Sequence, residues 1–203
     1  MIVHRMAQGS AEWHHIRSGI PTASELGNLV TDKFAHRKGE MPVSYLALKL
    51  AEKWLGGPLP TTASWATEQG KMLEEEAIPW IEFEEGISID RVGFITNDRG
   101  TFGASPDGIC GDVGFEIKSY QPVHHVKALL SGTVPEEHLP QIYGSMYATG
   151  FKSWRFVAYS RHFPKLLVTV QRDETIMAII EEALAAFYAR MDAAMARLKE
   201  LNG

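Results

Sequence analysis

The strongest constraint on the fold is a change in hydrophobic periodicity near residue 85. Before this point the apolar residues recur at helical spacing, whereas residues 87–120 form short β-type runs separated by Gly, Asn and Asp. Helical spacing then returns, two further β-type runs follow, and the chain closes in a long amphipathic segment. A helix-rich first third, a central group of strands and closing helices predict an α/β fold of the mixed α+β kind, with a central mixed β-sheet flanked by helices.

The same pattern predicts the individual elements. Helices are expected at 10–18, 23–30, 43–55, 66–84, 124–130, 136–149 and 173–201. Strands are expected at 87–89, 92–96, 101–104, 114–120, 154–160 and 165–172. Thr22 and Glu25 have the spacing of a capping box, in which Thr22 accepts a backbone hydrogen bond and Glu25 reaches back to the start of the helix. Residues 31–39 are expected to form a loop.

Length and composition limit the class of protein. The 203 residues contain no repeat or long linker, which predicts a single domain over residues 1–203. Cys110 is the single cysteine, so an intramolecular disulfide or a cysteine-held metal cluster is not expected. No apolar run reaches 18 residues and no secretory signal pattern is present, which predicts a cytoplasmic protein without a membrane partner. The net charge of -5 argues against coating nucleic acid through overall charge, but leaves room for a local basic groove.

Residues 105–119, SPDGICGDVGFEIKS, place three charged side chains in one predicted hairpin. Because side chains alternate along a strand, Glu116 and Lys118 point to one side while Ile117 points to the core, and the preceding turn presents Asp107 beside them. Carboxylates suit magnesium or manganese, and a neighbouring lysine can orient water or act as a base. Taken alone, the pattern is equally compatible with a solvated hairpin carrying a salt bridge.

The segment resembles the core motif of the PD-(D/E)xK nucleases, which have a restriction-endonuclease-like fold. More narrowly, it is similar to the phage lambda exonuclease and YqaJ-type viral recombinase branch. Further matches to that branch occur in order along the chain. They are Trp13-His14 with Arg17, Thr22-Ala23-Ser24-Glu25, Gly70-Lys71 with Glu74, the SPDG and ExK segments, and Gln141.

The resemblance implies a metal-dependent catalytic centre. Asp107, Glu116 and the backbone carbonyl of Ile117 would bind Mg²⁺, with Mn²⁺ as an accepted substitute, and Lys118 would be the catalytic lysine beside the attacking water. Two more residues would complete this centre. These are Glu74, through a second metal or bound waters, and Gln141, by ordering the water or the lysine.

The resemblance also implies a pocket for the 5′-phosphate of DNA. Arg17 would bind the phosphate, with Ser24 and Ser105 as hydroxyl donors and Trp13 packed nearby. A planar guanidinium can hold phosphate through two parallel hydrogen bonds, which supports the Arg17 assignment on physical grounds.

Other residues have weaker assignments. A basic loop with Lys33, Arg37 and Lys38 is a candidate for contacting duplex phosphates, and a solvated loop is an equal alternative. The family has a further acidic residue before SPDG. Here that position holds Asn97, with Asp98 next to it, so Asp98 and Asn97 are alternative candidates for this role.

The expected function is therefore 5′→3′ exonuclease digestion of one strand of linear double-stranded DNA to mononucleotides. It would start at a 5′-phosphorylated end and leave a 3′ overhang for phage-type recombination. The resemblance also implies a homotrimeric ring around the DNA and a single-strand annealing protein as partner. Two alternatives remain open: a structure-specific or restriction-like endonuclease with the same core, and a non-catalytic protein that binds DNA ends.

Overall fold

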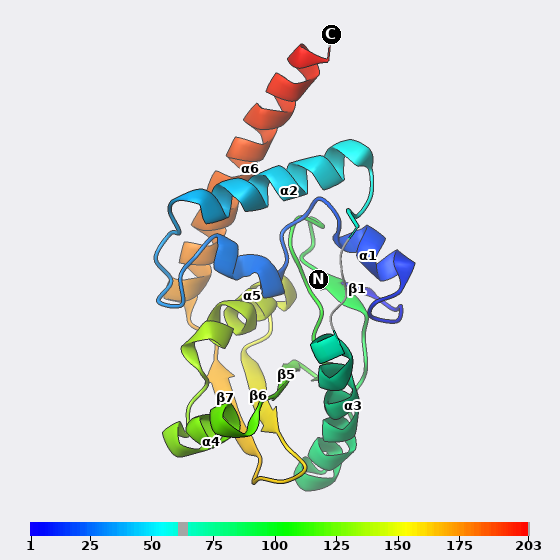
Figure 1. Ribbon diagram of the computed structural model, residues 1–203, viewed down its shortest axis with the longest axis vertical. Helices are drawn as coiled ribbons and strands as arrows, with labels where there is room; N and C mark the ends of the chain where they lie inside the picture. Colours follow the sequence, from blue (N-terminus) through cyan, green and yellow to red (C-terminus); the bar gives the residue numbers. More distant parts are fainter. Residues whose placement is uncertain (61–64, 203) are drawn as a thin grey trace.

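The described residues fold into helices and two small sheets (Figure 1). The computed structural model describes residues 1–60 and 65–202, and for residues 65–71 it describes the backbone alone. The helices are α1 (Ala11–Arg17), η1 (Ala23–Asn28), α2 (Glu40–Leu55), α3 (Trp65–Glu85), α4 (Pro122–Ser131), η2 (Glu136–His138), α5 (Leu139–Thr149) and α6 (Glu174–Leu201). The strands are β1 (Ile2–His4), β2 (Phe94–Thr96), β3 (Gly103–Ala104), β4 (Gly108–Cys110), β5 (Val113–Ser119), β6 (Ser153–Tyr159) and β7 (Leu166–Gln171).

The larger sheet has the order β4-β5-β6-β7. Strands β5 and β6 are parallel, while β4 and β7 add antiparallel edges. A second sheet, β1-β2-β3, is antiparallel throughout. The predicted mixed sheet with flanking helices is thus confirmed, and the two-residue-period pattern of residues 114–120 corresponds to β5.

Alternation along the strands gives the larger sheet two apolar faces. Trp154 and Phe156 of β6 belong to the main core with α5 and α6, whereas Val157 joins a second cluster with residues of α3. Because successive side chains of a strand point to opposite faces, helices can bury both sides of the sheet. Figure 1 shows the C-terminal part of α6 extending past α2, away from the sheet.

Several sequence predictions need correction. The predicted helix at 23–30 is a short 3₁₀ helix, η1, and the predicted capping box does not form, because Thr22 gives η1 no side-chain cap. Instead, the Thr22 hydroxyl donates to Glu25 Oε2 at 2.8 Å. The predicted strand at 87–89 is not a strand, since pairing there is reduced to the isolated bridge between Asp90 and Ile109.

The short strands β1 and β4 were not predicted. The loop predicted at 31–39 is present. Phe34 anchors it to the core: this buried residue has a φ of 56°, and its ring packs edge-on against Tyr143 with 5.2 Å between the ring centroids. Within the part of the chain that the structure describes, no helix combines the length and the apolar character needed to cross a membrane.

Candidate active site

The turn before β4 presents Asp107 to the end of the β4–β5 pairing. The register pairs Gly108 with Phe115, and beyond this point β5 has no further partner on β4. Asp107 takes the place of the missing strand: its backbone N–H donates to the Phe115 carbonyl at 3.1 Å, and its Oδ2 accepts from the Ile117 N–H at 2.5 Å. The carboxylate is therefore fixed to β5 beside Glu116.

Alternation along β5 separates apolar from charged side chains, as the sequence predicted. Phe115 and Ile117 are buried in the cluster with α3. Glu116 has a side chain only 1% exposed and forms an ion pair with Lys118, which is 25% exposed. Among the described residues, Glu116 Oε2 has no hydrogen-bond partner. A buried carboxylate oxygen without a donor is costly unless a cation binds it.

The charges of this group act on one another. Burial and the negative charge of Glu116 raise the pKa of Asp107 well above its ordinary value, while Lys118 opposes the shift. Burial lowers the pKa of Lys118, but Glu116 and Asp107 outweigh it, so the net shift is upward and the lysine is a stable cation. With both carboxyl groups ionised, two carboxylates share one ammonium, and this excess of negative charge is one cause of the raised pKa of Asp107.

Glu74, on α3, joins the same group. It lines a cavity of about 300 Å³ together with Asp107, and its charge contributes to the raised pKa of Asp107. Glu75 also lines this cavity, whereas Glu76 pairs with Arg161. The structure therefore places Glu74 beside Asp107, and its role in the centre remains a prediction. Gly70 and Lys71 of the same motif have side chains outside the described residues.

A tyrosine–histidine pair borders the site and was not predicted. Tyr120 follows Lys118 by two residues, and its hydroxyl lies 2.5 Å from Nε2 of His138, whose ring stacks on Phe156. Burial, and then the positive charge of Lys118, lower the pKa of His138 to about 4, so the ring is neutral. Gln141 lies in the first turn of α5, three residues after the N-cap residue His138. Tyr120 follows β5 and His138 ends η2, 18 residues further on, so the pair forms only through tertiary packing and has no local sequence signal.

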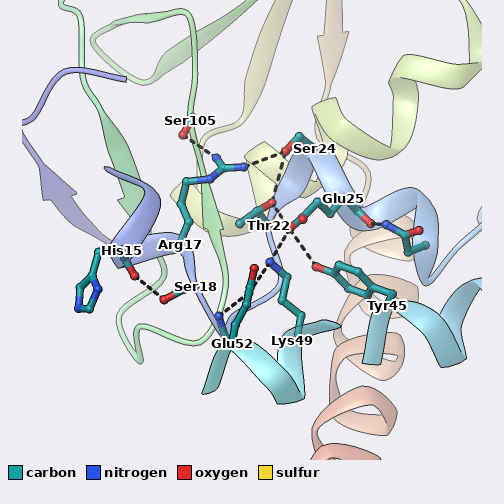
Figure 2. A network of polar contacts seen from close by, with 12 residues as sticks. His15, Arg17, Ser18, Thr22, Ser24, Glu25, Tyr45, Lys49, Glu52 and Ser105 are labelled. Atoms are coloured by element: carbon teal, nitrogen blue, oxygen red, sulfur yellow. Dashed lines mark hydrogen bonds and ion pairs between the residues drawn. The ribbon is translucent and has the colours of Figure 1, made fainter. Parts of the chain in front are cut away.

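Arg17 lies at the centre of a second group of polar residues (Figure 2). Its Nη1 donates to Ser105 Oγ at 2.9 Å and its Nη2 donates to Ser24 Oγ at 3.3 Å. The guanidinium stacks over the Trp13 ring at 4.0 Å, and the Trp13 indole N–H also donates to Ser105 Oγ at 2.9 Å. The structure therefore brings together all four residues assigned to the 5′-phosphate pocket.

The hydrogen bonds define what this group can bind. Ser105 Oγ accepts from both Trp13 and Arg17, so its own hydrogen remains available for a ligand. Burial lowers the pKa of Arg17, but a guanidinium stays protonated at any working pH. A cationic fork next to hydroxyl groups is suited to a phosphate. Ser105 and Asp107 belong to one turn, so this pocket adjoins the acidic group.

The remaining candidates lie outside these two groups. Lys33 and Lys38 are exposed on the loop at 31–39, and Arg37 donates to the Val30 carbonyl at 3.5 Å. Asp98 is 88% exposed and pairs with the N-terminal amino group. Asn97 accepts from the Thr101 N–H at 2.9 Å and closes a turn. The functional roles of these residues remain predictions.

The donor set near Asp107 fits a hard divalent cation. In the described part of the chain, no three His, Cys, Asp or Glu side chains form a ready-made metal cluster. The available oxygen donors are instead the Asp107 and Glu116 carboxylates, with their excess negative charge, and the adjacent Ile117 carbonyl. Oxygen donors with part of the shell left to water are typical of Mg²⁺ sites.

Comparison with known proteins agrees with this geometry. The alkaline exonuclease LHK-Exo from Laribacter hongkongensis is similar in structure, with a TM-score of 0.84 and 28% identity over 95% of this chain and 98% of that one. A structure of LHK-Exo in complex with dAMP gives a TM-score of 0.85 at the same identity and coverage. A phage-related exonuclease from Haemophilus somnus 129PT shares the fold, with a TM-score of 0.61 and 15% identity over 88% of this chain and 96% of that one.

Comparison with curated protein sequences gives no match. The model of the YqaJ-like viral recombinase domain matches residues 12–152, which include both the Arg17 pocket and the acidic group. The resemblance found in the sequence is thus confirmed, and the chain belongs to the YqaJ-like viral recombinase domain family.

Proposed function

We propose that the protein is a metal-dependent 5′→3′ exonuclease that degrades one strand of linear double-stranded DNA. It would start at a 5′-phosphorylated end, release mononucleotides and leave a 3′ single-stranded overhang. The observation that carries this proposal is the single turn that joins Ser105, in the cationic pocket, to Asp107, in the acidic group. A pocket for a terminal phosphate one step from a hydrolytic centre is the arrangement that an exonuclease needs.

The residues that would hold Mg²⁺ are Asp107, Glu116 and the carbonyl of Ile117, and Mn²⁺ would fit the same oxygen donors. Glu74 would act through bound waters or a second ion. When bound, the ion supplies charge stabilisation at the phosphodiester and lowers the pKa of a bound water. Lys118, held as a cation by Glu116 and Asp107, orients the attacking water and stabilises developing negative charge. Gln141 would help to order this water from the start of α5.

The direction of digestion follows from the position of the phosphate pocket. Arg17, Ser24 and Ser105 would hold the 5′-phosphate, and Trp13 keeps Ser105 and Arg17 in place. The bond that then reaches the acidic group is the next one inward, so each cleavage exposes a new 5′-phosphate for the same pocket. Related structures support the reaction class, since LHK-Exo is described as an alkaline exonuclease and was captured with dAMP.

The proposal extends to partners. We expect a homotrimeric ring that encloses the duplex, with Lys33, Arg37 and Lys38 contacting its phosphates, and a single-strand annealing protein that receives the overhang. Enclosure would retain DNA on a chain of net charge -5 without a broadly basic surface. The reaction would take place in the cytoplasm of a bacterial host, as part of phage-type recombination.

The test is digestion of three substrates with Mg²⁺: linear duplexes with 5′-phosphate or 5′-hydroxyl ends, and a closed circle. The phosphorylated linear duplex should be degraded fastest and the circle should be spared. Arg17→Ala should remove the preference for the phosphorylated end, while Glu116→Ala should abolish cleavage of both linear duplexes. Cleavage of the circle would refute the proposal and favour an endonuclease, and full activity of Glu116→Ala would refute the assigned centre.

A further inference from the structure

We propose that Lys49, on α2, is a positioning residue for the 5′-phosphate pocket, where it neutralises two carboxylates that would otherwise repel the phosphate. The proposal rests on the function proposed above and concerns how the Arg17 pocket selects its ligand. The residues involved are Arg17, Lys49, Glu25 and Glu52, which Figure 2 shows as one connected set. None of the last three was assigned a role in binding from the sequence.

Lys49 is a buried ammonium shared by two carboxylates. Its side chain is 4% exposed, and its Nζ lies 3.1 Å from Glu25 Oε2 and 3.2 Å from Glu52 Oε2. A lysine is almost never buried unless its charge is paired, and removal of one member leaves the others uncompensated. Lys49 therefore controls the net charge beneath the pocket.

The two carboxylates connect Lys49 to both sides of the pocket. Glu52 Oε2 accepts from the Gly19 N–H at 2.8 Å, two residues after Arg17. On the other side, Glu25 Oε2 accepts from the Thr22 hydroxyl at 2.8 Å and from the Tyr45 hydroxyl at 3.1 Å. Helix α2 thus holds the ends of the segment 19–25 that carries Ser24.

Glu25 also sets the direction of the hydroxyl chain. Because Thr22 donates its single hydrogen to Glu25, its oxygen is an acceptor toward Ser24 Oγ, which lies 3.3 Å away. Ser24 in turn accepts from Arg17. The position of the pocket hydroxyl therefore depends on a carboxylate that Lys49 holds.

The charges of the set balance when the pocket is empty. Arg17 and Lys49 contribute two positive charges, and Glu25 and Glu52 contribute two negative charges. Both carboxylates raise the pKa of Arg17 against the effect of burial, which shows that their fields reach the guanidinium. Without Lys49 the set would have a net negative charge and would oppose a phosphate dianion.

The measurement is the ratio of kcat/KM for linear duplexes with 5′-phosphate and 5′-hydroxyl ends, determined for each variant with Mg²⁺. A ratio taken within one preparation does not depend on the fraction of folded enzyme, so a role of Lys49 in global stability alone would leave the ratio unchanged. For Lys49→Met we expect the ratio to fall by about tenfold, the size of one charge-assisted hydrogen bond. The matched control is Lys53→Met, an exposed lysine one turn further along α2, which should keep the wild-type ratio.

A charge-rescue variant separates electrostatics from packing. Lys49→Met combined with Glu52→Gln restores a balanced set, and the amide oxygen still accepts from the Gly19 N–H, so the ratio should recover. Glu52→Gln alone gives the set a net positive charge, and the ratio should rise above that of the wild type. If Lys49→Met does not fold, Glu52→Gln alone still tests whether the net charge of the set controls the ratio.

The outcomes are distinct. A wild-type ratio near one would refute the phosphate pocket of the proposed function, and the Lys49 proposal with it. A clear wild-type preference that Arg17→Ala removes but Lys49→Met retains would overturn the Lys49 proposal alone. It would also be overturned if the rescue variant failed to recover the ratio, or if Glu52→Gln left the ratio unchanged or lowered it.

Discussion

Replacement of Lys118 by methionine tests the electrostatics of the acidic group without DNA. The ammonium pairs with Glu116 and lowers the pKa of Asp107, so its removal leaves two neighbouring carboxylates without a compensating charge. Loss of one partner from a buried ion pair costs about 3–5 kcal/mol. Since the Lys118 side chain is 25% exposed, we take the lower value, about 3 kcal/mol, in the absence of divalent cations.

The assay is thermal unfolding of the wild type and Lys118→Met in EDTA and in Mg²⁺. For a chain of this length, about 3 kcal/mol lowers Tm by roughly 6–12 °C in EDTA. Because the unpaired carboxylates attract a cation more strongly, Mg²⁺ should raise Tm by more in the variant than in the wild type. Exposed Lys127, on α4, provides the control Lys127→Met, which should match the wild type in both buffers.

Two results would contradict the predicted coupling of Lys118 to the carboxylates and to the cation. If Lys118→Met in EDTA were as stable as the Lys127→Met control, the carboxylates would not be coupled as described. If Mg²⁺ gave equal shifts in the two proteins, the cation would bind away from Lys118. Neither result depends on nuclease activity, so the test is independent of the reaction.

Three further predictions concern other parts of the molecule. Gly114→Ala should lower the free energy of unfolding by about 1–3 kcal/mol, because a Cβ there would lie 2.3 Å from the Trp154 ring. The control is Gly27→Ala, where the added Cβ enters open space, and its free energy of unfolding in a denaturant titration should match that of the wild type. The pKa of His138 is lowered from 6.5 to about 4, so the unfolded chain takes up a proton at a higher pH than the folded chain, and the wild type loses stability as the pH falls from 6.5 to 4. His138→Gln should lack this loss when Tm is measured at both pH values. Parallel pH profiles of Tm for the two proteins would contradict this prediction. Arg17→Lys should retain a weaker preference for 5′-phosphate ends than the wild type in competition digests, because an ammonium cannot form the two parallel hydrogen bonds of a guanidinium, and an unchanged preference would argue against the fork geometry.

The parts of the fold that the sequence predicted are those with a strong local pattern. Alternation identified β5 and the orientation of Glu116 and Ile117, and helical periodicity identified α6. The three-residue strands β1 and β4 are too short to have a pattern; β1 forms because the distant strand β2 pairs with it, and β4 forms as the short arm of a hairpin with β5. The segment 87–89 has β-type composition, but it does not form a strand, because the pairing next to it is limited to the single bridge between Asp90 and Ile109.

The same distinction applies to the sites. Asp107, Glu116 and Lys118 lie within one hairpin, so their proximity could be inferred from spacing alone. The ion pair between Glu25 and Lys49, which supports the Arg17 pocket, could not be inferred in this way, because the two residues come from different elements and meet only when α2 packs beside η1. The capping-box prediction illustrates the difference: Thr22 and Glu25 do interact, but the carboxylate is used to bind Thr22 and Lys49 rather than the helix start.

Labels on the two ends of one strand distinguish stepwise digestion from the 5′ end from every other order of cleavage. A linear duplex with a 5′-phosphorylated recessed or blunt end is labelled at the 5′ terminus of one strand in one sample and at its 3′ terminus in another. With digestion from the 5′ end, the 5′ label should appear at once as a mononucleotide, while the 3′ label should stay in DNA until digestion is nearly complete. Early release of the 3′ label, or release of the 5′ label in oligonucleotides, would contradict it.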